Sequence, residues 1–460
     1  MQIYNTLTRE LESFKPILQK KVTIYTCGPT VYKDVHIGNL RTYLTTDVLR
    51  RVLKANEYTV TSVMNITDVG HFRFSEEKGK SIDPIVEEAN ERGITPLELS
   101  EIYTEKFLKD AKKLNILEQD VMPKASDHIQ EIVEVIEVLL QKGFAYEADG
   151  NVYFKVEKFK TYGKLSGNTL DKMDQLLEAV RISVETDKKD SADFALWKKA
   201  EDRIMSWDSP WGMGVPGWHI ECSVMAMKYL GISLDIHLGG EDLVFPHHED
   251  EIAQSESFSG QKFVNYWMHT SFLTLEDEKM SRSKGNIYTL SEIEKAGYHP
   301  LAFRYLTYQT HYRAKMNFSK ESIEGASNAL RKLYDFAMAL PEPEGYADKY
   351  EVEFNHVLMQ DLNIPKALSL VWEMLRSKEP EEAKAAALRR MDEVLGLRIF
   401  ENSEIMNQVS EKATAMAAER VKLRKEGRYR LADEIRVQIE KMGYEVKDDP
   451  DGQTKLIKKI

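Results

Sequence analysis

The sequence predicts an α/β protein built on a parallel sheet, with an insertion in the sheet, a helical region after it and a small α+β unit last. The apolar, β-branched strand of residues 21–28 is followed by a helical pattern over residues 39–55 and a second strand over residues 59–67. A strand, a helix and a strand at this spacing form a parallel βαβ unit, which places ligands at the carboxyl ends of its strands. Another buried strand that ends in glycines, residues 233–240, indicates that the same sheet resumes much later in the chain.

The first helix is predicted from a regular apolar face. Leu40, Leu44, Val48 and Val52 recur every four residues, so they lie on one side of a helix that runs to about Ala55.

The middle of the chain changes character twice. Residues 96–145 favour helices and end at Gly143, a residue typical of helix C-termini. Residues 146–215 alternate short strand-like pieces such as NVYFKV with polar loops, which we interpret as an insertion into the sheet domain. A further helix is expected to start near Pro246 in FPHHEDEIAQSESF, because proline suits the first turn of a helix.

The rest of the chain is mostly helical. Residues 320–400 favour helices with a break at PEPEG, residues 341–345. Two helices are predicted at 411–426 and 429–442, and in the second of them Leu431, Ile435 and Ile439 share a face. The sequence DPDG at 449–452 predicts a turn between two short strands.

Composition limits the class of protein. The 460 residues exceed one hydrophobic core and predict several packed units, while 42% hydrophobic and 30% charged residues are typical of a globular protein. The net charge of −12 argues against a protein that coats nucleic acid indiscriminately, although residues 411–460 hold 13 Lys and Arg against 10 Asp and Glu. We find neither a signal peptide nor an apolar run of membrane-spanning length, so we expect a cytoplasmic location and no membrane partner.

Two short segments suit phosphate groups. HIGN at 36–39 lies where the first strand leads into the first helix, and free N–H groups at such a junction attract anions; His36 and Asn39 can donate hydrogen bonds, and Gly38 permits close approach. KMSRSKGN at 279–286 holds Lys279, Arg282 and Lys284, cations that can close over a triphosphate. Taken alone, the first is as consistent with a capping histidine and the second with a solvated basic loop. Both in this order are much less expected by chance.

A third group of residues suits a metal. In HHEDE at 247–251, His247 and Glu251 are four residues apart and point the same way on a helix, and with Cys27 and Cys222 they would form a zinc-like ligand set. The sequence leaves open whether these four meet and whether His248 replaces His247. Two buried, inert core cysteines and a polar helix face remain the alternative.

The chain resembles the cysteinyl-tRNA synthetases, a family of class I aminoacyl-tRNA synthetases, over nearly its whole length. HIGN and KMSRS are similar to the two signature motifs of the class. The family resemblance is carried by YTCGPTVY, NITDV, PGWHIECSVM, DIHLGGEDLVFPHHEDEIAQSE, NYWMHTSFL and the C-terminal LADEIRVQIEKMGYEVKDDPDG. Asn39 stands where the family often has a second histidine, and Arg282 replaces the usual second lysine of the loop.

The resemblance implies a fold and a reaction. It implies a Rossmann-type catalytic domain at 1–115 and 216–319, a connective insertion at 116–215, a helical bundle at 320–402 and an anticodon-binding domain at 403–460. The enzyme would activate L-cysteine with Mg²⁺-bound ATP and transfer it to tRNA(Cys), acting as a monomer. The closest alternatives are a ligase of the same fold that joins cysteine to an aminosugar, and a non-catalytic RNA-binding paralogue.

The resemblance also implies roles for single residues. One zinc ion per chain, bound by Cys27, Cys222, His247 and Glu251, would recognise the substrate sulfur and so reject serine. Thr67 and Trp218 would line the cysteine pocket beside Cys27. The ATP site would be formed by His36, Gly38, Asn39, Gly239, Asp242, Lys279 and Arg282, with His36, Asn39, Lys279 and Arg282 acting in catalysis.

Overall fold

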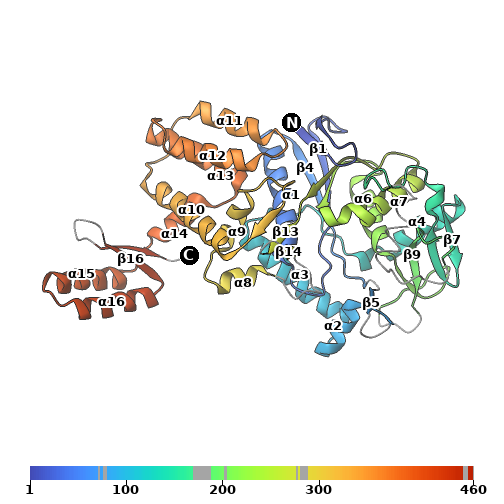
Figure 1. Cartoon of the computed structure of the whole chain (residues 1–460), viewed down its shortest axis with the longest axis horizontal. Coiled ribbons are helices and arrows are strands. Elements are labelled where there is room, and N and C mark those ends of the chain that lie inside the picture. Colours follow the sequence, from blue (N-terminus) through green and yellow to red (C-terminus); the bar gives the residue numbers. More distant parts are fainter. Residues whose placement is uncertain are drawn as a thin grey trace.

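A four-stranded parallel sheet lies at the centre of the molecule. The computed structural model describes residues 1–70, 73–75, 80–168, 188–200, 205–275, 278–279, 288–448 and 454–458. The sheet has the order β12-β11-β3-β4 and consists of β3 (Lys21–Thr26), β4 (Thr59–Met64), β11 (Leu234–Gly240) and β12 (Val264–Thr270), all parallel. The predicted βαβ unit and the return of the sheet after an insertion are therefore confirmed (Figure 1).

Helix α1 (Ile37–Ala55) connects β3 to β4 and is buried on nearly all sides. Its predicted apolar face, Leu40, Leu44, Val48 and Val52, is at most 1% exposed. Arg41, Asp47 and Arg50 on the same helix are also buried. Asp47 pairs with Arg304 on α9, whereas Arg41 and Arg50 donate to backbone carbonyls of segments that pack beside α1. The apolar periodicity found the face toward the sheet and could not indicate these polar contacts.

A largely antiparallel unit projects from the sheet domain between β4 and β11. Its sheet has the order β10-β9-β8-β7, from β7 (Ala145–Ala148), β8 (Asn151–Phe154), β9 (Phe194–Lys199) and β10 (Gly214–Pro216). Helices α2 (Pro84–Arg92), α3 (Pro96–Lys113) and α4 (Ile129–Gln141) precede it, and Gly143, at φ 74°, follows the end of α4 as predicted. Two short hairpins complete the first half of the chain, β1 (Gln2–Asn5) with β2 (Glu10–Ser13) and β5 (Arg73–Ser75) with β6 (Lys80–Ile82).

Two helices flank strand β11 in sequence, α6 (Trp218–Leu230) before it and α7 (Glu249–Ser259) after it. The helix predicted to start near Pro246 begins regularly only at Glu249. Residues Val244–His248 form a π-helical turn in which Phe245 has an extended backbone, at φ −141° and ψ 131°. Only Phe245 departs from helical backbone angles in this turn, and an extended backbone is typical of the residue that precedes a helix, so the predicted start near Pro246 is confirmed, although regular α-helical hydrogen bonding begins at Glu249.

A small sheet and a helical bundle follow the parallel sheet. Strand β13 (Leu273–Leu275) pairs with β14 (Glu278–Lys279) and with β15 (Met316–Phe318). The helices are α8 (Leu290–Lys295), α9 (Pro300–Thr307), α10 (Lys320–Ala339), α11 (Asp348–Leu358), α12 (Ile364–Leu375), α13 (Glu381–Leu395) and α14 (Ile399–Asn407). The break predicted at 341–345 is the connection between α10 and α11.

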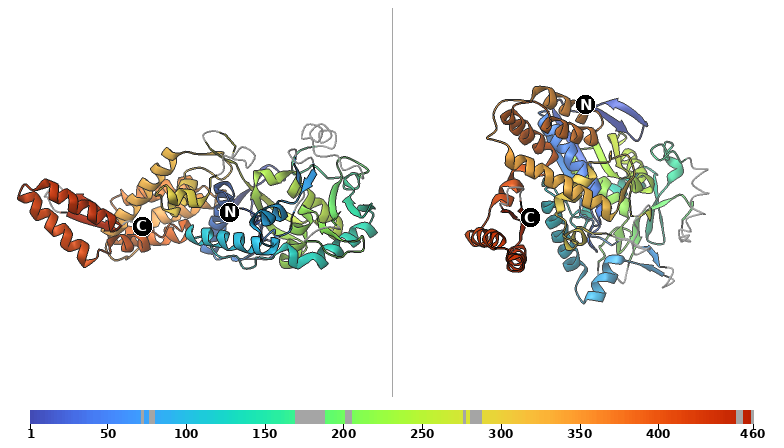
Figure 2. Two further views of the ribbon diagram at one scale, coloured as in Figure 1. Left: turned by 90° about the horizontal axis from the view of Figure 1, so that it is seen from below. Right: turned by 60° about the vertical axis from the view of Figure 1, so that its left-hand side comes forward.

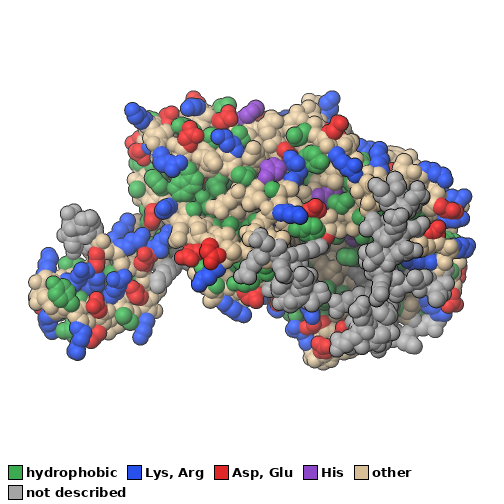
Figure 3. All heavy atoms as spheres, viewed as in Figure 1, with side chains coloured by type: hydrophobic (Ala, Val, Ile, Leu, Met, Phe, Trp, Pro, Cys, Tyr) green, Lys and Arg blue, Asp and Glu red, His purple; other side chains and the backbone are tan. Residues whose placement is uncertain are grey.

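The last unit extends away from the rest of the molecule, at the end opposite the antiparallel insertion (Figure 2). It consists of α15 (Glu411–Lys425), α16 (Tyr429–Lys441), β16 (Tyr444–Asp448) and β17 (Thr454–Lys458), close to the predicted helices and strands; the turn predicted at 449–452 lies outside the described residues. It has a small core of its own, while Ile457 belongs to the main core. Charges of both signs are intermixed on its visible face (Figure 3). No helix in the described ranges is long and apolar enough to cross a membrane.

Candidate active site

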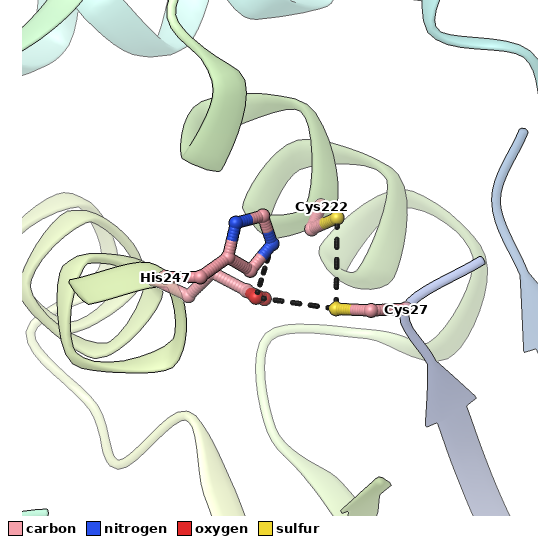
Figure 4. A group of neighbouring side chains, drawn as sticks. Cys27, Cys222 and His247 are labelled. Atoms are coloured by element: carbon pink, nitrogen blue, oxygen red, sulfur yellow. Dashed lines mark hydrogen bonds and ion pairs between the residues drawn. The ribbon is translucent and has the colours of Figure 1, made fainter. Parts of the chain in front are cut away.

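Four side chains far apart in the sequence meet beside the carboxyl end of β3. Cys27 follows β3, Cys222 lies on α6, His247 lies in the turn before α7, and Glu251 lies on the first turn of α7. Their ligand atoms all lie within 4.8 Å of one another, and all four side chains are buried. Figure 4 shows Cys27 pointing from the strand end toward Cys222 and His247.

The distances within this group leave the four donor atoms facing a common point. The two sulfur atoms are 3.8 Å apart, Cys27 Sγ is 3.5 Å from Glu251 Oε1, and His247 Nε2 is 3.2 Å from the same oxygen. Two sulfurs, one imidazole nitrogen and one carboxylate oxygen form a donor set that zinc prefers in proteins. The residues present therefore fit a zinc ion.

The charges of the group also suit a cation. The hydrogen bond donated by the Cys27 thiol lowers the pKa of Cys222 to about 7. Burial lowers the pKa of His247, but the Cys222 and Glu251 groups outweigh burial and raise it to about 10. A partly ionised thiol and a carboxylate thus hold a proton on the imidazole between them, and a divalent cation would replace that proton.

Three further histidines lie behind the group. His237 Nε2 is 2.9 Å from Glu251 Oε2, His248 Nε2 is 3.4 Å from Cys27 Sγ, and His248 Nδ1 is 2.7 Å from His269 Nε2. Cys27, His237, His248 and Glu251 also have donor atoms within 4.8 Å of one another. Both ring nitrogens of His248 are engaged with neighbours, which favours His247 as the ligand and the other histidines as outer partners.

The first turn of α7 is fixed by carboxylates that the sequence reasoning missed. Asp250 accepts hydrogen bonds from the Tyr162 hydroxyl and from His219 Nδ1, the latter at 2.5 Å. Glu249 accepts from the backbone N–H groups of Gly163 and Ser166 at 2.9 and 2.8 Å. Three consecutive acidic residues in HHEDE were the available signal, yet nothing in the sequence shows that the first two bind the insertion.

A cavity of about 320 Å³ opens next to the four-residue group. Residues predicted from the sequence line it from several segments: Cys27, His36, Gly38, Asn39, Trp218 and Asp242. The Trp218 ring lies 5.1 Å from the His247 ring, measured between centroids, so one wall of the cavity leads directly to the buried donors. The cavity therefore joins the HIGN turn to the four-residue group.

His36 is the N-cap of α1, with its Nδ1 accepting a hydrogen bond from the Asn39 N–H at 3.2 Å. His36 can cap α1 and also contact a ligand, because the same residue lines the cavity. The Ile37 N–H donates to the Tyr288 carbonyl at 2.9 Å, so the segment that follows the KMSRS loop is tied to the HIGN turn.

Two other predicted residues, Thr67 and Gly239, are not among the residues that line the cavity, and the side chains of Lys279 and Arg282 lie outside the described part of the structure. Thr67 is buried, accepts a hydrogen bond from Asn65 Nδ2 at 3.0 Å and does not line the cavity. Gly240 lines the cavity and Gly239 does not. Gly239 faces the His248 ring instead, because a Cβ on Gly239 would lie 2.6 Å from that ring. Lys279 pairs with Thr274 in the β13–β14 hairpin, and Arg282 lies outside the described residues.

The turn after β3 is closed by a close backbone approach. The Gly28 N–H donates to Asn65 Oδ1 at 2.8 Å, and a Cβ on Gly28 would lie 1.7 Å from the Asn65 carbonyl oxygen. Tyr32, Lys33 and Thr42 also line the cavity and were not singled out from the sequence. Their places beside GPT and HIGN could have suggested them.

Comparison with known proteins agrees with this geometry. Residues 13–328 match the family described as "tRNA synthetases class I (C) catalytic domain". A "Cysteine--tRNA ligase" of Thermococcus gammatolerans is 41% identical, with 98% of each chain covered. A "Cysteine--tRNA ligase 1" of Burkholderia lata is 40% identical over 98% of this chain and 96% of that protein.

A solved structure extends the likeness to the fold. The chain aligns with methionyl-tRNA synthetase of Mycobacterium tuberculosis in complex with methionyl-adenylate, with a TM-score of 0.57 and 15% identity, over 84% of this chain and 91% of that one. At this identity the match supports the Rossmann-type fold alone. The family match and the near-complete coverage of the relatives lead to one conclusion: the chain belongs to the class I tRNA synthetases, in the family of the cysteine–tRNA ligases.

Proposed function

We propose that this enzyme activates L-cysteine with ATP and transfers the cysteinyl group to the 3′ end of tRNA(Cys). The observation that carries the proposal is the buried group of Cys27, Cys222, His247 and Glu251 at the wall of the cavity that the HIGN turn lines. The names of the full-length relatives support the same reaction.

We infer that zinc bound by these four side chains selects the substrate. A zinc ion there would supply a Lewis acid that takes a substrate sulfur as a ligand and favours its thiolate form. A hydroxyl is a much weaker ligand for such a site, so serine would be rejected without a second, hydrolytic site. The hydrogen bond between His237 and Glu251 would hold the carboxylate oriented toward the ion.

The residues around the cavity would then position both cysteine and ATP. Trp218, 42% exposed, presents its ring beside His247 and would bound the amino-acid side of the cavity. His36 and Asn39 at the positive end of α1 would bind ATP phosphates, and Asp242 would face the ribose. With Mg²⁺ on ATP, the cysteine carboxylate would attack the α-phosphate, so that catalysis rests on alignment and charge stabilisation.

The C-terminal unit is our candidate for the part of the enzyme that binds the tRNA anticodon. The domain limits stay predictions: 1–115, 116–215, 216–319, 320–402 and 403–460. Lys279 and Arg282 would neutralise the departing pyrophosphate. We further propose that the enzyme works as a monomer in the cytoplasm, where reducing conditions keep Cys27 and Cys222 from forming a disulfide and so available to bind a metal.

Cysteine-dependent exchange between ATP and pyrophosphate tests the first step. We expect exchange with cysteine, its loss after zinc is removed by a chelator, its return on adding zinc, and at least about a 1,000-fold preference over serine. Cys222→Ser and His247→Gln should abolish exchange. His128→Gln is the matched control, because His128 is equally buried and its described hydrogen bonds go to Lys124 and Tyr229, away from the four-residue group.

Charging of tRNA(Cys) transcripts tests the second step. Formation of an amide between cysteine and an added aminosugar, with release of AMP and without charging of tRNA, would instead favour the aminosugar ligase. RNA binding without any exchange would favour the non-catalytic paralogue. Exchange that is indifferent to zinc, or equal with serine and cysteine, would contradict the proposed role of the metal group.

A further inference from the structure

Arg41 is a buried cation on α1. All of its described hydrogen bonds go to backbone carbonyl groups. It stands two residues after Asn39 and is 2% exposed. Its Nη1 donates to the carbonyls of Ser271 and Phe272 at 2.8 and 3.0 Å. Its Nη2 donates to the carbonyls of His311 and Ala314 at 3.1 and 2.7 Å.

These four carbonyls belong to the two segments that begin the small sheet. Ser271 and Phe272 line the cavity and lead into β13, whereas His311 and Ala314 lead into β15. The two segments also bond to each other, from the Ser271 N–H to the Tyr312 carbonyl at 2.8 Å and from the Met316 N–H to the Phe272 carbonyl at 3.1 Å. Strand β13 then pairs with β14, which contains Lys279.

We propose that Arg41 is the positioning residue that holds the β13–β15 sheet, and with it the cavity wall formed by Ser271 and Phe272, at a fixed distance from the HIGN turn. This inference rests on the proposed function. The planar guanidinium fork is suited to the task because each of its two terminal nitrogens serves a different segment. A lysine has one ammonium nitrogen and cannot reach both segments in the same way.

Arg41 should matter more for formation of the adenylate than for transfer of cysteine to tRNA. Formation of the adenylate would need ATP aligned in the cavity that the HIGN turn, Ser271 and Phe272 line, whereas transfer to tRNA starts after pyrophosphate has left. A small displacement of the sheet should therefore slow adenylate formation selectively. It should leave cysteine binding unchanged, because Cys222, His247 and Trp218 lie on elements that Arg41 does not contact.

Arg50 provides a matched control on the same helix. It is 1% exposed, and its guanidinium donates to the carbonyls of Leu117 and Glu118 at 2.8 and 2.6 Å. Neither of those residues lines the cavity. Arg41→Lys and Arg50→Lys thus remove the same kind of buried fork, and only the first is linked to the small sheet.

The experiment compares both variants with the wild-type, zinc-loaded protein. For Arg41→Lys we expect kcat of ATP–pyrophosphate exchange to fall about 10- to 100-fold, with KM for cysteine within about twofold of wild type. Single-turnover transfer from preformed cysteinyl-adenylate to tRNA should stay within about threefold of wild type. Arg50→Lys should leave both steps near wild type, whatever its effect on thermal stability.

Two results would overturn the inference. One is an equal loss of both steps in Arg41→Lys, and the other is a kinetic profile like that of Arg50→Lys. Arg41→Met serves as a second variant, with an exchange rate expected below that of Arg41→Lys; an equal or higher rate counts against the role. Absence of exchange in the wild-type protein would instead reject the proposed function, so the two failures are distinguishable.

Discussion

Asp47 on α1 and Arg304 on α9 form an ion pair in which neither side chain has any exposed surface. Arg304 also donates to the carbonyls of Leu114 and Leu395, at 2.8 and 2.7 Å. Asp47 in turn accepts from Arg51 Nε at 2.8 Å. The first helix of the parallel sheet is thereby fastened to the helical bundle through charges that water cannot reach.

Removing one partner of this pair should destabilise the whole protein. In Asp47→Asn, Arg304 stays buried with its carbonyl partners but without its countercharge, and we expect a loss of roughly 3–5 kcal/mol in the free energy of unfolding. Urea denaturation measures it. Asp208→Asn, at an exposed loop position, is the control and should change stability by less than about 0.5 kcal/mol.

The same pair predicts a dependence on pH. Burial raises the pKa of Asp47, but Arg304 and Arg51 outweigh burial and lower the pKa below its ordinary value. The stabilisation is therefore present above the unfolded-state pKa of about 4 and is lost as the pH falls toward the folded value. The difference in stability between wild type and Asp47→Asn should be constant near pH 7 and shrink in acid; a difference that grows in acid would refute it.

Cobalt offers a direct view of the metal group. Apoprotein titrated with Co²⁺ should develop a thiolate-to-cobalt charge-transfer band, because two sulfurs lie within reach of one ion. Cys222→Ser should about halve that band per bound ion, and His128→Gln should leave it intact. A band unaffected by Cys222→Ser would place the ion elsewhere.

Trp218 should affect cysteine more than ATP. Its exposed ring borders the cavity next to His247, so Trp218→Ala is expected to raise KM for cysteine about tenfold, the loss of roughly 1.4 kcal/mol of contact. KM for ATP should change little. Trp211→Phe, which alters an indole packed against Trp197 outside the cavity, is the control.

The C-terminal unit should be separable from adenylate formation. Arg420, with a side chain 2% exposed, donates from Nη1 and Nη2 to the two Asp448 oxygens at 2.6 and 2.8 Å, joining α15 to β16. Asp448→Asn should weaken this unit by roughly 1–3 kcal/mol. We expect tRNA charging to fall while ATP–pyrophosphate exchange persists.

Hydrogen exchange of β16 and β17 amides would follow the loosening in Asp448→Asn, and Glu419→Gln on the exposed side of α15 is the matched control. An equal loss of ATP–pyrophosphate exchange and of tRNA charging in Asp448→Asn would contradict the prediction that the two activities are separable.

Local pattern predicted much of the fold. The period of the apolar residues located α1, and a short apolar run that ends at a glycine located β3, because both patterns record burial against a neighbour. The sequence could not show that Arg41, Asp47 and Arg304 are buried, since charged residues usually mark a solvated face, and the contacts from Arg41 to Ser271 and from Arg304 to Asp47 span 230 and 257 positions. Long-range carbonyl acceptors leave no signal in the residue type.

The candidate site divides in the same way. Cys27, Cys222, His247 and Glu251 were named because their donor chemistry is distinctive, and the structure brings them together. Thr67 and Gly239 were carried over from the family resemblance, and the structure places both outside the cavity lining. His219 and Asp250 were missed, because their hydrogen bond joins two different helices, α6 and α7, across 31 positions of the chain.

The approach of Gly28 to Asn65 has a consequence for how this chain can vary. A methyl group at position 28 would overlap the Asn65 carbonyl oxygen, an atom of the backbone that cannot rotate away. In a library of all single codon changes selected for growth, we expect position 28 to return glycine alone, whereas its neighbour Thr30 should accept several residues. The requirement for glycine at position 28 thus limits which substitutions the chain can tolerate in this part of the cavity wall.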